Sequence, residues 1–135
     1  MDPQQIHEAR DSLSRCVQNG DFLTSFYEHF MASSEDIKAK FAQTDFERQK
    51  KVLQDSLFLM MVAAGTEKGP ARKELEKLAQ RHSREQLDIK PEWYVNWLEC
   101  LMKAVSEHDP KYSPEVEASW RASLADGIEF LKSRY

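Results

Sequence analysis

The stretch from residue 75 to residue 82 contains the side chain whose chemistry is least expected from its surroundings. Four of its residues are spaced i, i+3, i+4 and i+7, which predicts one face of a helix: Leu75, Leu78, Ala79 and His82. Three of the four are apolar, so the imidazole of His82 points where a leucine would be expected. Because a buried imidazole needs a partner, the pattern indicates either a metal ligand or a core histidine bonded to a backbone carbonyl.

Two more polar side chains fall within the apolar stripes of other predicted helices. Tyr27 lies in the stripe of a helix expected over 21–32, and Gln49 lies three residues after Phe46 and four before Leu53. Each alone also fits a simpler interpretation, a core tyrosine bonded to a backbone carbonyl or a glutamine reaching solvent from the edge of its stripe. Three such exceptions on separate helices indicate that these helices face a common non-protein object.

The other histidines and the familiar motifs offer no competing site. His7 and His29 lie beside their stripes and His108 lies at a helix end, so we interpret all three as solvated. The sequence contains no glycine-rich phosphate loop, no HExxH, no GxSxG and no CxxCH. It also lacks a helix-borne Glu-x-x-His set for a di-iron centre.

The elements that position these residues are all expected to be helices. Only four glycines and five prolines occur, and they separate periodic segments, which predicts an all-α protein of about seven helices. The expected helices span about 3–17, 21–32, 35–41, 45–64, 70–85, 91–108 and 114–135, with loops at 19–20 and 65–69. Ser34 is the expected N-cap of the third helix, and Thr44 that of the fourth through a capping box with Glu47.

Length and composition set the remaining bounds. We expect residues 1–135 to form a single domain that needs no disulfides for its stability. The net charge of -4 gives no basic footprint for nucleic acid, and the longest apolar run, 57–64, is too short to cross a membrane. Cys16 and Cys100 form no CxxC motif and suit a reducing cytoplasm, and no signal peptide is recognisable, so we expect a cytoplasmic protein.

Taken in order, these features resemble the globin family, most of all the single-domain bacterial globins and the globin domain of flavohaemoglobins. The matching segments are Phe26-Tyr27 with Phe30, residues 37–41, Gln49 with Leu53, residues 78–82, residues 90–94, and Trp120. The resemblance implies a globin-like fold of helices around a pocket for non-covalently bound haem b. It also implies reversible binding of O2, and of NO or CO, by a monomer or homodimer.

On the proximal side of the implied pocket, His82 would be the iron ligand. Tyr94 matches a tyrosine that helps to fix this side, and Leu78 belongs to the His82 face. Arg81 is expected to bond a haem propionate. The chain stops at Tyr135, before the place of a glutamate that supports the proximal side in flavohaemoglobins, so we predict weak peroxidase activity.

On the distal side, Tyr27 and Gln49 match the pair that hydrogen-bonds the gas ligand, and Leu53 lines the same pocket. Phe41 matches the phenylalanine that wedges against the porphyrin. Trp97 replaces a small aliphatic residue in the alignment through residues 90–92. It is either a space-filling core residue or a third hydrogen-bond donor to the ligand, because an indole can only donate.

Two other functions are kept as alternatives to reversible gas binding. The first is NO dioxygenation with a separate reductase, because no flavin or nicotinamide domain follows the globin-like segment. The second is a haem-free globin-like signalling module, which would have no need of a ligating imidazole. The sequence therefore leaves open whether the protein is an enzyme.

Overall fold

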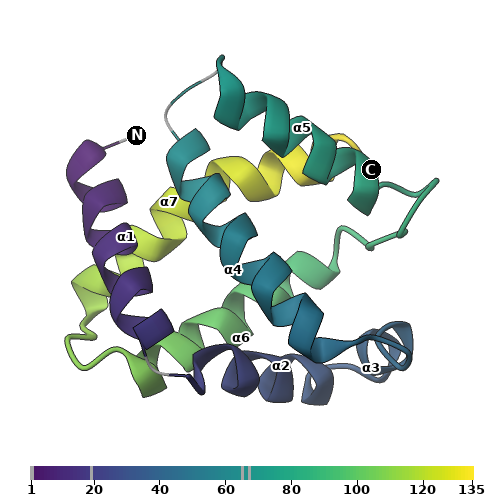
Figure 1. Ribbon diagram of the computed structural model, residues 1–135, viewed down its shortest axis with the longest axis horizontal. Coiled ribbons are helices and arrows are strands. Elements are labelled where there is room, and N and C mark those ends of the chain that lie inside the picture. The colour runs from purple at the N-terminus through teal and green to yellow at the C-terminus, as the bar shows by residue number, and fades with distance from the viewer. Residues whose placement is uncertain (1, 19, 65, 67) are drawn as a thin grey trace.

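The computed structural model describes residues 2–18, 20–64, 66 and 68–135, and every regular element within them is an α-helix (Figure 1). The seven helices are α1 (Pro3–Gln18), α2 (Phe22–Ala32), α3 (Glu35–Lys40), α4 (Phe46–Ala63), α5 (Pro70–His82), α6 (Trp93–His108) and α7 (Pro114–Ser133). The all-α prediction and its seven helices are confirmed for these residues. The expected loops at 19–20 and 65–69 fall partly on Asn19, Gly65 and Glu67, which lie outside the described residues.

The helix starts show where local sequence chemistry decided the boundary. The Ser34 hydroxyl accepts from the Ile37 amide at the start of α3, as predicted. The predicted Thr44 cap of α4 is wrong by one residue, since the Asp45 carboxylate accepts from the amides of residues 47 and 48 at 3.2 and 3.3 Å. Asp45 is as good a cap and adds a negative charge at the positive end of the helix, while the Thr44 amide donates to the Phe41 carbonyl in the preceding turn.

The helices pack as crossing pairs. α1 packs against α7 and α2 against α6, while α4 contacts both α5 and α7. In Figure 1, α4 runs through the middle of the view, with α5 above it and α2 and α6 below. Apart from α3, which packs on the neighbouring α2, each helix contacts at least one helix distant in sequence, as in other all-α folds built from amphipathic helices.

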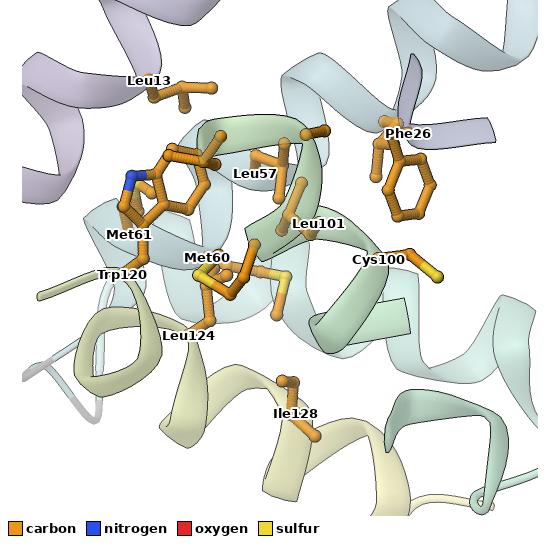
Figure 2. Packing of buried hydrophobic residues seen from close by; sticks show 14 of the residues in the cluster. Leu13, Phe26, Leu57, Met60, Met61, Cys100, Leu101, Trp120, Leu124 and Ile128 are labelled. Atoms are coloured by element: carbon orange, nitrogen blue, oxygen red, sulfur yellow. The ribbon is translucent and has the colours of Figure 1, made fainter. Parts of the chain in front are cut away.

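One apolar core runs through the molecule beside the α7 helix. Figure 2 shows Trp120, Leu124 and Ile128 of α7 in the same core as Met60 and Met61 of α4. Gly127 lies between them in the packing, because a Cβ atom there would approach the Met60 Cε atom to 2.7 Å. A side chain at this position would therefore force the Met60 side chain to shift.

A buried polar cluster joins α1 to the α6–α7 connection. The Asp109 side chain is fully buried and receives two hydrogen bonds from Arg15, at 2.7 and 2.9 Å, and one from Ser12 at 2.5 Å. The Trp120 indole in turn donates to the Ser12 hydroxyl at 2.8 Å. Burial alone would raise the pKa of Asp109, but the hydrogen bonds from Arg15 and Ser12 outweigh it and lower that pKa.

Candidate functional site: an aromatic cavity beside His82

Five helices enclose an internal cavity that opens to the surface. Its empty volume, counted together with open space at its mouth, is about 730 Å³. The lining residues come from α2, α4, α5, α6 and α7 and from the segments that follow α3 and α5. All but one of the residues singled out in the sequence line this cavity: Tyr27, Phe41, Gln49, Leu53, Leu78, His82, Tyr94 and Trp97.

The two ring nitrogens of His82 have different surroundings, and the structure shows the carbonyl partner that the sequence offered as one of two interpretations. Its Nδ1 lies 2.8 Å from the Leu78 carbonyl oxygen, one turn earlier in α5, so Nδ1–H donates to a backbone acceptor. This bond favours the tautomer whose Nε2 carries a free lone pair, and Nε2 has no hydrogen bond within the described residues. Burial lowers the pKa of His82, which keeps the imidazole neutral and able to ligate.

The loop after α5 folds back on the helix and closes the cavity next to His82. The Ile89 amide donates to the His82 carbonyl at 3.1 Å, which brings the Ile89 side chain to the cavity wall. Asp88 adopts a positive φ of 52° and is held by the Tyr135 hydroxyl and by Lys90. The hydrogen bond from Tyr135 and then that from Lys90 lower the pKa of Asp88, so the carboxylate is ionised at neutral pH.

Tyr27 and Gln49 meet at one wall of the cavity, from α2 and α4. Tyr27 is only 6% exposed, and its hydroxyl interacts with the Gln49 side chain. Burial raises the pKa of Tyr27 to about 12, against a smaller lowering by Gln49, so the hydroxyl stays protonated near pH 7. A polar donor pair in an otherwise aromatic wall can orient a small polar ligand.

Two of the aromatic side chains that α6 contributes to the cavity wall, Tyr94 and Trp97, were predicted as site residues. The Trp97 ring packs edge to face on Phe26, with centroids 6.3 Å apart, and its indole N–H has no hydrogen bond within the described residues. Burial raises the pKa of Tyr94 to about 12, and its hydroxyl likewise has no bonded partner among those residues. The donor role of Trp97 and the proximal role of Tyr94 therefore stay predictions.

Arg81 lies outside the cavity, at its opening. It lines an outer groove with Lys40 and Arg48, and this groove shares the walls formed by Phe41 and His82 with the cavity. Three cationic side chains and one carboxylate, that of Asp45, thus line a groove next to the apolar cavity, which leaves the groove with an excess of positive charge. This arrangement suits a ligand with an apolar body and an anionic edge.

Of the other histidines, none lines the cavity. His7 is exposed beside Asp11, and His29 bonds Glu107 at 2.9 Å. The expectation that His108 is solvated is wrong, because its Nε2 bonds the Ser25 hydroxyl at 2.7 Å and its Nδ1 is buried without a partner. Over the part of the chain that the structure describes, no three His, Cys, Asp or Glu side chains are grouped to hold a metal ion.

Several cavity residues were not predicted as site residues. They are Phe26, Phe30, Val52, Ser56, Met60, Ile89, Trp93 and Leu131. Four of the eight, Phe26, Phe30, Met60 and Leu131, belong to predicted apolar stripes, so the sequence identified these four as core without indicating that they face a cavity. Helical spacing from Gln49 and Leu53 would have found Val52, Ser56 and Met60, which continue the same face of α4.

Comparison with known proteins identifies the fold that builds this cavity. The family model described as Globin matches residues 24–128. The chain belongs to the globin family. It is also similar, at 37% identity and a TM-score of 0.92, to a Pseudomonas aeruginosa protein whose crystal structure is described as structurally highly homologous to a human hemoglobin. That match covers 97% of this chain and 98% of the other, while no curated protein matches the chain.

The family assignment confirms the predicted globin-like fold and the resemblance to single-domain bacterial globins. Globins in general bind haem, and the cavity of this globin fits such a group by the chemistry of its walls. It offers one free imidazole nitrogen, a surrounding shell of aromatic and aliphatic side chains, and cations at the opening. No helix among the described residues has the length and apolar character needed to cross a membrane.

Proposed function

We propose that this globin binds O2 reversibly, and NO and CO as well, at a haem b held by His82 within a single domain of residues 1–135. The observation that carries the proposal is that the two ring nitrogens of His82 have different surroundings. Its Nδ1 lies 2.8 Å from the Leu78 carbonyl oxygen, and its Nε2, beside the aromatic cavity, has no hydrogen bond to any residue that the structure describes. A fixed, neutral imidazole with one free nitrogen is what a single axial ligand requires.

Haem supplies the iron at which a diatomic gas binds when only one axial position is taken by the protein. The chain's own residues would then exclude water, hold the anionic edge of the haem and donate hydrogen bonds to the gas. Phe41, Leu53 and Leu78 exclude water from the cavity. Arg81, with its cationic neighbours at the opening, holds the anionic propionate edge.

Tyr27 and Gln49 provide the hydrogen bonds to the gas. Since the Tyr27 hydroxyl keeps its proton at neutral pH, it donates to a ligand that gains partial negative charge, and this slows the escape of O2. Trp97 is proposed as a third donor in the same wall. Bound CO gains less charge, so the donors should retain O2 more strongly than CO.

The partner of His82 supports gas binding over peroxide chemistry. A carboxylate bonded to a ligating imidazole gives it anionic character, which favours O–O cleavage. Here the Nδ1 partner is a neutral backbone carbonyl. The proposed site should therefore have weak peroxidase activity.

The test is a titration of the purified protein with haem, followed by reduction and exposure to O2 and CO. We expect a 1:1 complex whose ferrous form shifts reversibly in the visible spectrum with each gas. A protein that takes up no stoichiometric haem would refute the proposal and favour a haem-free signalling module. Steady NO consumption with an added reductase, faster than with free haem, would instead show the NO dioxygenase.

A further inference from the structure

A second pocket lies on the surface between α2 and α4, directly outside Tyr27. It has an empty volume of about 580 Å³ and almost entirely apolar walls. Its lining residues are Thr24, Tyr27, Glu28, Met31, Phe46 and Lys50. Tyr27 is the one residue that lines both this pocket and the internal cavity, within the described residues. The two spaces are therefore separated by little more than one side chain.

The partition consists of two aromatic rings. The Phe46 ring meets the Tyr27 ring edge to face, with centroids 5.2 Å apart, and is partly exposed on the outer side. Phe46 also stacks on Phe41, which lines the cavity. A Phe ring forms no hydrogen bond, so Phe46, which is only partly buried, can move aside without breaking a polar contact.

A polar side chain that lines this pocket connects α2 with α4. The Lys50 ammonium lies 3.2 Å from the Thr24 hydroxyl and 2.9 Å from the Glu47 carboxylate, so one side chain bridges the two helices. The accessible wall of the pocket is nevertheless almost entirely apolar. Such a wall admits a small apolar molecule at little desolvation cost.

The other opening of the cavity has the opposite character. It is lined by Lys40, Arg48 and Arg81, the cations that hold the propionate edge in the proposed function. In the proposed function these residues would hold the propionate edge of a haem at this opening. The gas would then need a separate way to reach the Tyr27 side of the cavity.

We propose that diatomic gases enter and leave through the surface pocket between α2 and α4, past the paired rings of Phe46 and Tyr27. The pocket acts as a docking site for small apolar molecules, and Phe46 acts as the gate between it and the cavity. This inference rests on the proposed function, because it assumes that haem fills the cationic opening.

The first test uses the methionine methyl groups as local probes for xenon, an apolar gas substitute. Of the five methionines, Met31 lines the surface pocket and Met60 the cavity, whereas Met61 and Met102 are buried and line neither. Methyl NMR of the diamagnetic CO complex under increasing xenon pressure should show a saturable shift for Met31. A Met31 response no larger than that of Met102 would overturn the proposed docking site.

The second test measures CO association after laser flash photolysis. Met31→Trp fills the surface pocket without touching the cavity, and we expect association to slow by about tenfold, the factor that corresponds to about 1.4 kcal/mol in the entry barrier. Gln43→Trp is the matched control, because Gln43 lines only the cationic opening. A slow Gln43→Trp with a normal Met31→Trp would overturn the route.

A variant that is expected to speed CO association distinguishes the proposed route from a general loss of structure, which would not speed it. Phe46→Leu removes part of the gate and should speed CO association and lower the fraction that recombines before escape. Phe58→Leu, on the same helix but lining neither space, should leave both unchanged. Equal effects of the two variants would overturn the role of Phe46. A wild-type protein that forms no CO complex would instead refute the proposed function.

Discussion

Replacing Tyr27 by Phe removes one hydroxyl from the cavity wall and leaves the ring in place. The ring contacts of Tyr27 with Phe26 and Phe46, at 4.9 and 5.2 Å between centroids, need no hydroxyl and should persist. The substitution therefore isolates the proposed hydrogen bond to the gas from the packing of α2. The measured quantity is the rate of O2 release.

The size of the effect follows from the chemistry of the bond. A hydrogen bond to a charged group contributes about 1.5–3 kcal/mol. At tenfold per ~1.4 kcal/mol, O2 release from Tyr27→Phe should be about ten- to a hundredfold faster than from the wild type. Gln49 interacts with the Tyr27 hydroxyl, so its amide loses a partner in the variant and can turn to the gas, which places the expected value near the lower bound.

The assay is stopped-flow O2 displacement by CO with Tyr27→Phe, Trp97→Phe and the double variant. The Tyr112 hydroxyl bonds Glu117 away from the cavity, so Tyr112→Phe is the matched control and should be silent. If Trp97→Phe changes release by less than about twofold in both backgrounds, its donor role is refuted by the missing coupling. A silent Tyr27→Phe would refute the distal assignment itself.

Three further predictions concern stability and the retention of haem. Asp109→Asn should lower the free energy of chemical unfolding by about 3–5 kcal/mol, because it breaks a buried ion pair. Since the fold lowers the pKa of Asp109, the wild type should lose this stability as the pH falls from the ordinary pKa of ~3.9 through the lowered one. An Asp109→Asn variant with the same acid sensitivity as the wild type would contradict this. Gly127→Ala should destabilise by about 1–3 kcal/mol, because its Cβ meets the Met60 Cε and Cγ atoms at 2.7 and 3.2 Å, and an added Met60→Ala should recover part of the loss; additive effects would contradict the clash. Arg81→Ala should speed haem transfer to an acceptor globin by about tenfold, a charge-assisted bond of ~1.5 kcal/mol, whereas the exposed Arg10→Ala should not, and equal rates would refute the propionate role.

The sequence predicted the helices well because each buries one apolar face, and that face repeats with the helical period. It erred where two neighbouring residues had equal chemistry. Thr44 and Asp45 are both good caps, and only the turn before α4 decides between them. For the next pair, Met60 and Met61, the helical period left open which one belongs to the apolar stripe; both are buried, and Met60 lines the cavity.

The polar residues of the candidate site could be predicted because they interrupt apolar stripes, but the apolar residues that line the cavity could not. His82, Tyr27 and Gln49 stand out because burying a polar group without a partner is costly. Trp93 and Leu131 look like ordinary core residues, since nothing in their spacing distinguishes a cavity wall from a packed interior. The fold of the loop after α5 depends on the positive φ of Asp88 and on its distant contact with Tyr135, which no local pattern reveals.

The most direct test of the central claim is the resonance Raman spectrum of the ferrous, gas-free protein, compared with His82→Gly supplied with imidazole. We predict an iron–histidine stretching band at a globin-like frequency, lower than in peroxidases, because the Leu78 carbonyl is the partner of Nδ1. In His82→Gly the band should vanish, and a new band should appear when imidazole is added. An unaltered band in His82→Gly would contradict the account, because another side chain would then hold the iron.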